Sequence, residues 1–360
     1  MTAKGNNTFV ADLEEAQQQN AEAERLRLNA RVDEKTRELS AAKTLIRSLQ
    51  SEVDRLAVVE NMLDMSFVKE PTWCKVPVRK KKGEHGTVCL LLSDLHLDEV
   101  VDPSEMMGRN AFNRDIADLR LKKIFEGFIE QARYYHQGTV YDGAVVALGG
   151  DLLNGTIHDE LRETNEYPVP DSIQYWVPKI VSGLLLIADE FGKVHVPSVP
   201  GNHGRLTQKP RYKKRSQDNT DWLMSMLIAA QLKGDSRFTF DIPNSMDTTF
   251  KVYNTTVFLT HGDQTGGGSG IGGIFPPIMR MKARKQANFI FDWMILGHFH
   301  QYVHTQGITV NNSLKGWDEY ALGHSFPFEE PGQAMFILTP EHGLTWPVQI
   351  FCQDRRIEGW

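Results

Sequence analysis

From about residue 88 onward, short apolar runs alternate with longer amphipathic stretches. The short runs predict buried strands at 88–92, 143–148, 194–199, 256–260 and 293–296. The stretches between them predict helices at about 115–135, 173–191 and 221–232. Residues 302–350 predict several further strands separated by Gly and Pro turns. Alternation of this kind is typical of the α/β class.

The N-terminal pattern is different. Residues 11–65 are rich in Ala, Glu, Gln, Lys, Arg and Leu, contain no Gly or Pro, and predict one long helix. Apolar side chains recur in alternating steps of four and three residues, at Leu28, Val32, Leu39, Ala42, Ile46, Leu49, Val53, Leu56 and Leu63. Lys35 and Glu60 interrupt the series. This seam predicts self-association or a partner helix through residues 28–63, in a coiled coil; the alternative is a helix folded back on its own chain.

These patterns divide the chain into three parts. We expect a helical coiled-coil segment over residues 1–65, a linker over 66–86 and an α/β domain over 87–360. The linker contains Pro71, Pro77 and the basic run 79–82, which is typical of a solvated hinge, with phosphate contact as the alternative.

Composition narrows the classes of protein. The net charge of −6 argues against a wholly basic nucleic-acid coat but leaves room for a local basic groove. Three cysteines, far apart in sequence, form neither a disulfide framework nor a zinc knuckle. No N-terminal signal pattern and no apolar run of the roughly 20 residues needed to cross a bilayer is present. We therefore expect a cytoplasmic protein without a membrane partner.

Polar, metal-capable residues follow the predicted strands. The motifs are Asp94-Leu95-His96, Gly150-Asp151, Gly201-Asn202-His203, His261-Gly262 and Gly297-His298-Phe299-His300. Ligands bind at the carboxyl ends of strands in α/β sheets, because the loops converge there. A buried carboxylate or imidazolium is costly unless it is paired, so cations would neutralise such a cluster. The mixed oxygen and nitrogen set predicts a site for two divalent metal ions.

Local geometry supports the pairing of these ligands. Side chains two residues apart share one side of an extended backbone, so Asp94 and His96 are expected to point the same way. The same holds for His298 and His300. Each motif alone is weak, and the ordered set is what carries the prediction.

Through this ordered set of motifs, the sequence resembles the calcineurin-like metallophosphoesterase superfamily over about residues 88–350. The resemblance implies a sandwich of two mixed β-sheets flanked by helices, and a hydrolase with two divalent metal ions. Manganese is the expected metal, with iron, zinc, nickel or magnesium as alternatives. The layout is also similar to that of bacteriophage-encoded members, which would place the protein in the host cytoplasm.

The resemblance also implies a role for each ligand. Asp94, His96 and His300 would bind the first metal, and Asn202, His261 and His298 the second. Asp151 would bridge both ions, and His203 would contact the phosphate and protonate the leaving oxygen. Arg205, next to the motif, is a candidate phosphate clamp.

Departures from two branches of the superfamily follow Asp151. Phosphoprotein phosphatases carry a second acid and an arginine after this aspartate, where this chain has Leu152-Leu153-Asn154-Gly155. Recombination-repair nucleases place a histidine at the position of Asn154 and follow Gly-Asn-His with an aspartate rather than Gly204. The chain belongs plainly to neither branch.

The substrate stays open between three hypotheses. Residues 205–215 hold six basic residues, one tyrosine and no acid, and a second basic stretch spans 280–285; both favour a nucleic-acid phosphodiesterase, that is, a nuclease. The glycine-rich segment 266–273 suits a loop that closes over a compact phosphate, which favours a small-molecule phosphomonoesterase or a cyclic-nucleotide phosphodiesterase. The third hypothesis is a non-enzymatic scaffold, although no metal ligand is missing from the set.

Overall fold

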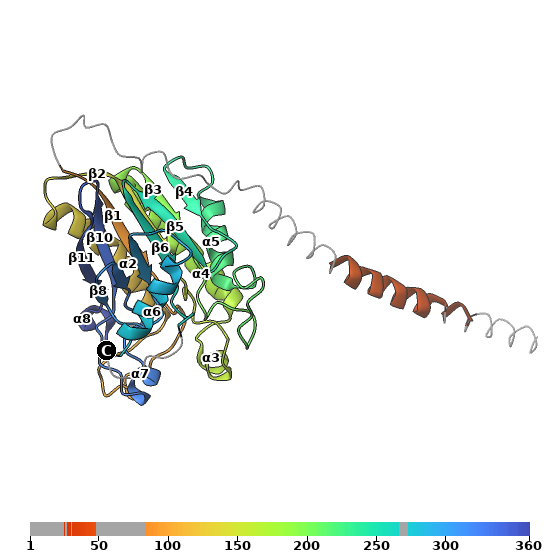
Figure 1. Ribbon diagram of the computed structural model, residues 1–360. Helices are drawn as coiled ribbons and strands as arrows, with labels where there is room; N and C mark the ends of the chain where they lie inside the picture. The colour runs from red at the N-terminus through yellow and green to blue at the C-terminus, as the bar shows by residue number, and fades with distance from the viewer. Residues whose placement is uncertain (1–24, 26, 30, 48–83, 266–272) are drawn as a thin grey trace, which may run out of the picture. The chain divides into compact units, whose positions relative to one another are not determined.

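The computed structural model describes residues 25, 27–29, 31–47, 84–265 and 273–360 (Figure 1). The chain divides into two compact units, residues 1–64 and 65–360. In the first unit, residues 31–47 are helical. Its apolar seam residues Leu28, Val32, Leu39 and Ile46 are 55–62% exposed. That a second helix covers this seam stays a prediction. The rest of the helix predicted over 11–65 and the basic run 79–82 lie outside the described residues.

The larger unit contains two mixed β-sheets. The six-stranded sheet has the order β11-β10-β1-β2-β3-β4, with β1 to β4 parallel and β10 and β11 antiparallel. Its strands are β1 (Glu84–Leu92), β2 (Thr139–Leu148), β3 (Val194–Pro197), β4 (Phe238–Asp241), β10 (Gly332–Thr339) and β11 (Gly343–Phe351). The five-stranded sheet has the order β5-β6-β7-β9-β8. Its strands are β5 (Asp247–Val252), β6 (Thr255–Thr260), β7 (Trp293–Leu296), β8 (Val303–Thr305) and β9 (Ile308–Val310).

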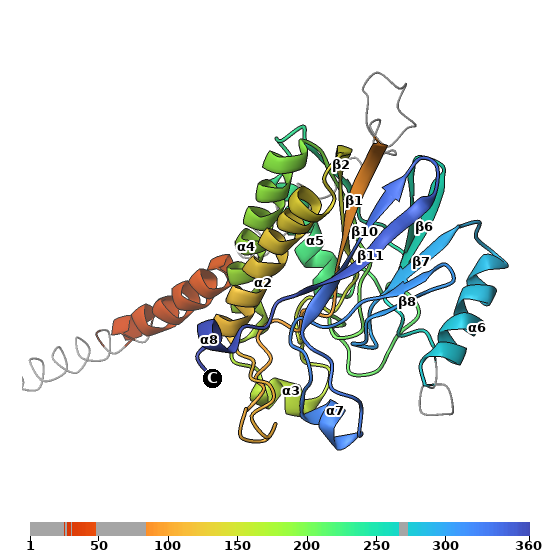
Figure 2. The ribbon, with the colours of Figure 1, turned by 90° about the vertical axis from the view of Figure 1, so that its left-hand side faces the viewer.

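Helices cover the outer faces of both sheets. Figure 2 shows α2 (Arg114–Glu130) and α4 (Val169–Phe191) beside the six-stranded sheet, and α6 (Phe275–Gln286) on the far side of the other sheet. The remaining helices are α5 (Thr220–Gln231) and the short α3 (Asp159–Thr164), α7 (Glu319–Gly323) and α8 (Arg355–Glu358). The larger unit is therefore an α/β sandwich of two mixed sheets flanked by helices, which confirms the predicted fold class.

Alternation along the strands builds two cores. On β6, Val257 and Leu259 face the first sheet and pack in a cluster with Leu91 of β1, whereas Phe258 between them faces α6. Phe258 packs there with Ile278, in a second apolar cluster. The two sheets are thus held together by one apolar layer and α6 by another.

The sequence located the central strands but not every boundary. β1 begins at Glu84, so the last residues of the expected linker belong to this strand. The helix expected over 115–135 is α-helical only to Glu130 and continues as a π-helical turn, η2 (Gln131–Tyr135). Helix α6 was not predicted; it begins directly after the glycine-rich segment and carries prolines in its first turn, where a helix tolerates them. Within the described ranges, no helix combines the length and apolar character needed to cross a membrane.

Burial of His195 predicts a component of acid unfolding. This side chain on β3 is 4% exposed, and burial lowers its pKa from 6.5 to about 4. A lowered histidine pKa means that the unfolded chain binds the proton first, so stability is full above pH 6.5 and falls as the pH drops towards 4. Between pH 7 and 4.5, we expect the free energy of unfolding of His195→Gln to fall by about 2 kcal/mol less than that of the wild type. Urea unfolding at each pH measures both values. Parallel pH profiles for the two proteins would contradict this assignment.

Candidate metal centre

The metal-capable side chains lie on backbone turns and not on extended strand. β1 ends at Leu92, and Asp94 and His96 have left-handed backbone with φ of 52° and 45°. His298 and His300 are also left-handed, with φ of 72° and 52°. The prediction that strand alternation aligns each pair was therefore wrong about the cause. The side chains converge because sharp turns redirect the backbone beyond the strand ends.

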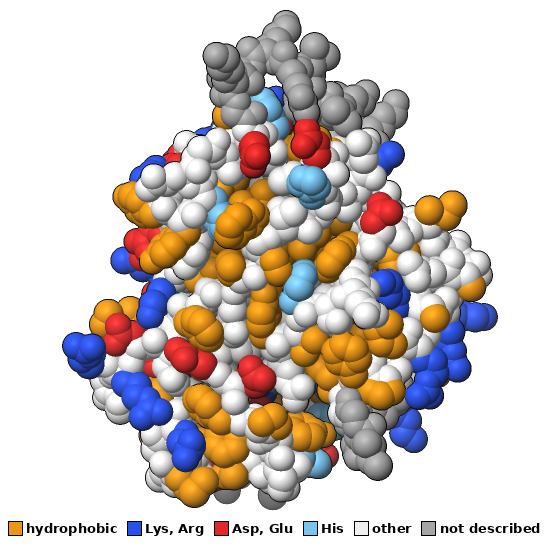
Figure 3. Space-filling view, turned by 60° about the vertical axis from the view of Figure 1, so that its left-hand side comes forward, with side chains coloured by type: hydrophobic (Ala, Val, Ile, Leu, Met, Phe, Trp, Pro, Cys, Tyr) orange, Lys and Arg blue, Asp and Glu red, His pale blue; other side chains and the backbone are white. Residues whose placement is uncertain are grey.

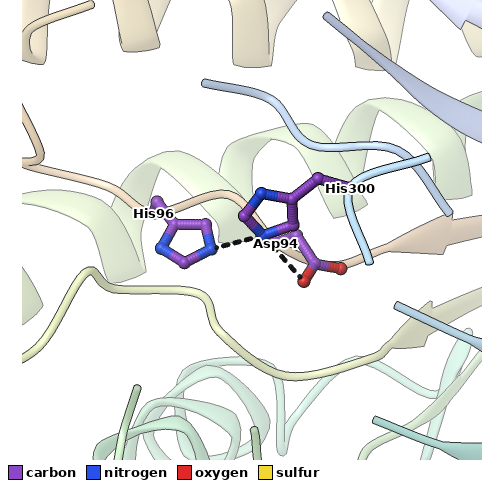
Figure 4. A group of neighbouring side chains, drawn as sticks. All are labelled: Asp94, His96 and His300. Atoms are coloured by element: carbon purple, nitrogen blue, oxygen red, sulfur yellow. Dashed lines mark hydrogen bonds and ion pairs between the residues drawn. The ribbon is translucent and has the colours of Figure 1, made fainter. Parts of the chain in front are cut away.

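The first group of ligand atoms comes from both sheets (Figure 4). Asp94, His96 and His300 each offer a ligand atom within 4.8 Å of the others. His96 Nε2 lies 3.0 Å from His300 Nε2, and His300 Nε2 lies 3.5 Å from Asp94 Oδ1. Asp94 and His96 are fully buried, and Asp94 Oδ1 also accepts the backbone N–H of His298 at 2.8 Å.

A second group lies beside the first. Asp151, His261 and His298 again place ligand atoms within 4.8 Å of one another. His261 Nε2 is 3.0 Å from Asp151 Oδ2 and 3.1 Å from Asn202 Oδ1. Its Nδ1 faces the Gly149 carbonyl at 2.9 Å, which leaves Nε2 as the atom directed at the cluster. The structure therefore brings Asn202 into this group as well.

Asp151 connects the two groups. Together with His96 and His203 it forms a third set whose ligand atoms lie within 4.8 Å of one another. Asp151 Oδ1 accepts the backbone N–H of His203 at 2.7 Å, which ties the Asn202-His203 turn to this carboxylate. All the ligands predicted from sequence therefore meet in one place, with Asp151 between the two groups.

His203 is oriented by a backbone carbonyl. Its Nδ1 lies 2.8 Å from the carbonyl of Asn154, so this nitrogen carries a proton and Nε2 is left for the cluster. A main-chain oxygen thus sets the orientation of this imidazole. The side chain of Asn154 also reaches His96 Nδ1, at 3.2 Å. Asn154 therefore supports two imidazoles, a role that sequence reasoning missed.

Electrostatics favour cations at this cluster. Burial and the nearby Lys315 hold the pKa of His96 well below its ordinary value, so its imidazole is in the neutral form that binds metal. Burial would raise the pKa of Asp151, but the charges of His261 and His203 outweigh it and keep this carboxylate ionised. A proton on His261 balances that charge when no cation is bound, because Asp151 raises the pKa of His261 despite its burial. Imidazoles and carboxylates in this arrangement fit a pair of divalent metal ions that share Asp151.

The Asp221 side chain links two of the ligand turns by hydrogen bonds. This buried carboxylate at the start of α5 accepts the backbone N–H groups of Asp151 at 2.9 Å, Leu152 at 3.0 Å and Gly201 at 2.9 Å. Burial and the charge of Asp151 raise the pKa of Asp221 to about 6. The sequence offered no sign of this role, because an aspartate in the first turn of a helix, here two residues after the N-cap Asn219, is ordinary.

The Arg205 side chain forms hydrogen bonds within its own loop. Its guanidinium donates to the carbonyls of Asn202, Thr207 and Gln208, each at 3.0 Å. These contacts favour a structural role for Arg205 over the expected phosphate clamp. Beyond it, a pocket opens next to the metal centre, and the residues that line it are Asn202, Arg205, Thr207, Pro210, Arg211, Lys213, Arg215, Asp218 and Asp263.

Other basic residues are partly used within the fold. Arg215 forms an ion pair with Asp263, and on α6 the Lys285 ammonium pairs with Asp247. A row of Lys and Arg side chains lies at the right-hand edge of Figure 3, the side on which Figure 2 shows α6. In the glycine-rich stretch predicted as a phosphate loop, residues 266–272 lie outside the described residues.

Comparisons with known proteins place the chain beside several solved structures. No family model matches the chain, and no curated protein matches it. Vacuolar protein sorting 29 from Cryptosporidium parvum is similar at 11% identity and a TM-score of 0.31, covering 74% of this chain and 99% of that one. A predicted phosphoesterase from Streptococcus pneumoniae has 12% identity, a TM-score of 0.28 and coverage of 73% and 98%. A dimetal phosphatase from Danio rerio has 11% identity, a TM-score of 0.34 and coverage of 74% and 99%. Values of this size add no argument to the geometry above.

Close packing of glycine against a ligand gives a test of the site. A Cβ on Gly201 would lie 2.1 Å from Asp151 Oδ1 and 2.4 Å from its backbone nitrogen, so an alanine must displace this carboxylate. We expect Gly201→Ala to weaken binding of Mn²⁺ by more than about 10-fold, measured by isothermal titration calorimetry. Gly234→Ala is the matched control, because its Cβ meets nothing within 4 Å. Unchanged Mn²⁺ affinity in Gly201→Ala would show that Asp151 is not a ligand.

Proposed function

We propose that the chain is a metal-dependent phosphoesterase of the metallophosphoesterase class that hydrolyses phosphodiester bonds, with nucleic acid as its substrate. The observation that carries the proposal is the convergence of buried carboxylates and imidazoles on Asp151, from turns far apart in sequence. Paired sites of this composition are used for phosphoester hydrolysis because two cations offset the charge of the phosphate.

Metal binding and proton donation are assigned to different residues of the chain. Asp94, His96 and His300 would hold one divalent ion, Asn202, His261 and His298 the other, and Asp151 would contact both. Bound ions supply Lewis-acid activation of water and of the phosphate oxygens. His203, with its Nδ1 proton held by the Asn154 carbonyl, presents Nε2 at the cluster. In its doubly protonated form, with a second proton on Nε2, it is the proposed proton donor to the leaving oxygen and becomes neutral by that transfer.

Nucleic acid is the proposed substrate because of the loop beside Asn202. Arg211 and Lys213 line the pocket there and are exposed, so both can contact phosphates that flank the one at the metal centre. Tyr212 between them is 89% exposed and free to stack on a base. A small-molecule phosphomonoesterase or cyclic-nucleotide phosphodiesterase is the alternative, and it needs none of these groups outside the cluster.

Removal of the shared ligand tests the enzyme assignment. Asp151→Asn keeps the shape of the side chain but loses the charge that would hold both ions. We expect hydrolysis of bis-p-nitrophenyl phosphate with Mn²⁺ to fall by more than about 100-fold, beyond the 10–100-fold typical of residues behind a metal ligand. Retained turnover in Asp151→Asn would contradict a shared-ligand mechanism.

The same assay with several substrates tests the finer assignment. Wild-type protein is offered labelled single- and double-stranded DNA, p-nitrophenyl phosphate and cyclic nucleotides. Cleavage of DNA supports the nuclease proposal. Intact DNA alongside rapid turnover of the monoester or of a cyclic nucleotide would replace it with the small-molecule alternative.

Salt dependence tests the phosphate contacts of the loop. We expect Arg211→Gln/Lys213→Gln to reduce the slope of log affinity against log salt by about 1.4 for single-stranded DNA, because each neutralised phosphate contributes about 0.7. Binding is measured by fluorescence anisotropy with Ca²⁺ in place of Mn²⁺. The control is Lys193→Gln/Lys233→Gln, which removes the same charge from two exposed positions. These lysines precede β3 and β4, whereas the metal-capable turns follow the carboxyl ends of the strands. Equal slopes for the two double variants would remove the support for nucleic acid.

A further inference from the structure

A compact group of charged side chains is buried behind the first ligand group. Lys315 is 4% exposed, Asp318 is 5% exposed and Glu99 is 8% exposed. The Lys315 ammonium donates to both carboxylate oxygens of Glu99, each at 2.8 Å, and forms an ion pair with Asp318 Oδ2 at 2.5 Å. We call these three residues the Lys315 cluster. The metal ligands and the proposed proton donor do not include any of them.

The cluster contacts the back of a proposed ligand. Glu99 Oε2 lies 3.5 Å from His96 Nδ1, on the side of the ring opposite to Nε2, which faces His300. The Asn154 amide oxygen is the other neighbour of this Nδ1, at 3.2 Å. Imidazole ligands are commonly fixed by an oxygen that binds the nitrogen turned away from the metal. The Asn154 oxygen makes that hydrogen bond here, and the Glu99 carboxylate lies in contact with the same nitrogen as a second oxygen. Lys315 in turn fixes Glu99, because its two hydrogen bonds leave this carboxylate one orientation.

The segment that carries Lys315 also holds the other ligand of this turn. The backbone N–H of Leu314 donates to the Asp94 carbonyl at 3.1 Å, and the Ser313 hydroxyl donates to the same oxygen at 2.9 Å. The Lys315 carbonyl is itself anchored, by the Arg120 guanidinium at 2.9 Å and the Asn110 amide at 2.8 Å. One anchored segment thus reaches Asp94 through its backbone and His96 through the Lys315–Glu99 pair.

Burial of these charges is costly to stability. Desolvation of each ion costs several kcal/mol, and apolar residues of similar volume are often as stabilising as a buried ion pair. Packing alone therefore does not account for a lysine and two acids at this point. Their position against the turn that carries Asp94 and His96 does account for them.

We propose that Lys315 is a positioning residue for the first metal position, acting through Glu99 on His96. The inference rests on the proposed metal centre and extends it to residues that do not touch the ions. The effect is on ion affinity: without the ammonium, Glu99 is free to rotate and the His96 ring loses a fixed support. The second position, formed by Asn202, His261 and His298, has no contact with the cluster in the described part of the chain and keeps its affinity.

The test is calorimetric titration of Mn²⁺ into the full chain. We expect the wild type to bind two ions, and Lys315→Met to bind one of them about 10- to 100-fold more weakly and the other unchanged. Glu99→Gln weakens the same binding event, and Lys315→Met/Glu99→Gln weakens it no more than the worse single variant, because the two residues act as one unit. Should Lys315→Met fail to fold, Glu99→Gln carries the same prediction.

The control separates positioning from a general loss of stability. Tyr253→Phe removes buried hydrogen bonds to Asp142, at 2.7 Å, and Thr87, at 3.0 Å, near the start of β1. This variant is expected to melt at a lower temperature and to bind both ions as the wild type does. Two unchanged ions in Lys315→Met and in Glu99→Gln would overturn the inference alone. A wild type that binds no Mn²⁺ would overturn the proposed metal centre and the inference with it.

Discussion

Left-handed backbone at the ligand positions is the constraint on which the structure depends. Asp94, His96, Asp151, His298 and His300 all have φ between 45° and 72°, a region that non-glycine residues rarely adopt. Each such residue costs of order 1–3 kcal/mol and persists only where its surroundings leave no alternative. The turns are therefore what makes a single cluster from segments of both sheets, and the rest of the molecule must hold them in place.

Two sets of buried polar groups do so. On the side of the second position, the Asp221 carboxylate binds backbone amides of the Asp151 and Gly201 turns at once. On the side of the first position, Ser313 and Leu314 donate to the Asp94 carbonyl, and the Lys315 cluster contacts His96. Glycine completes the arrangement where a side chain has no room: a Cβ on Gly297 would lie 2.0 Å from Asp94 Oδ2. The apolar layers on both faces of β6 keep the sheets, and with them the turns, in register.

The sequence predicted the fold class and the ligand set because both depend on local patterns. Apolar runs marked β1, β2, β6 and β7, and each polar residue that followed a run was a candidate ligand. The supporting residues escaped, because their roles depend on contacts between distant segments. Asp221 is 70 residues from Asp151, and Lys315 is 216 residues from Glu99. No local pattern along the chain pairs residues at such separations. Arg205 shows the converse case: its place near His203 suggested a phosphate contact, and the structure adds a structural role, since three of its N–H groups donate to carbonyls of its own loop.

The proposed mechanism needs two divalent ions that bind side by side and share Asp151. Anomalous diffraction at the manganese absorption edge, from crystals grown with Mn²⁺, can locate both ions. Two peaks about 3.5–4 Å apart are expected. One peak should lie among Asp94, His96 and His300, the other among Asn202, His261 and His298, and the Asp151 carboxylate should lie between them. No peak at this cluster in well-ordered crystals, or one peak without contact to Asp151, would contradict it.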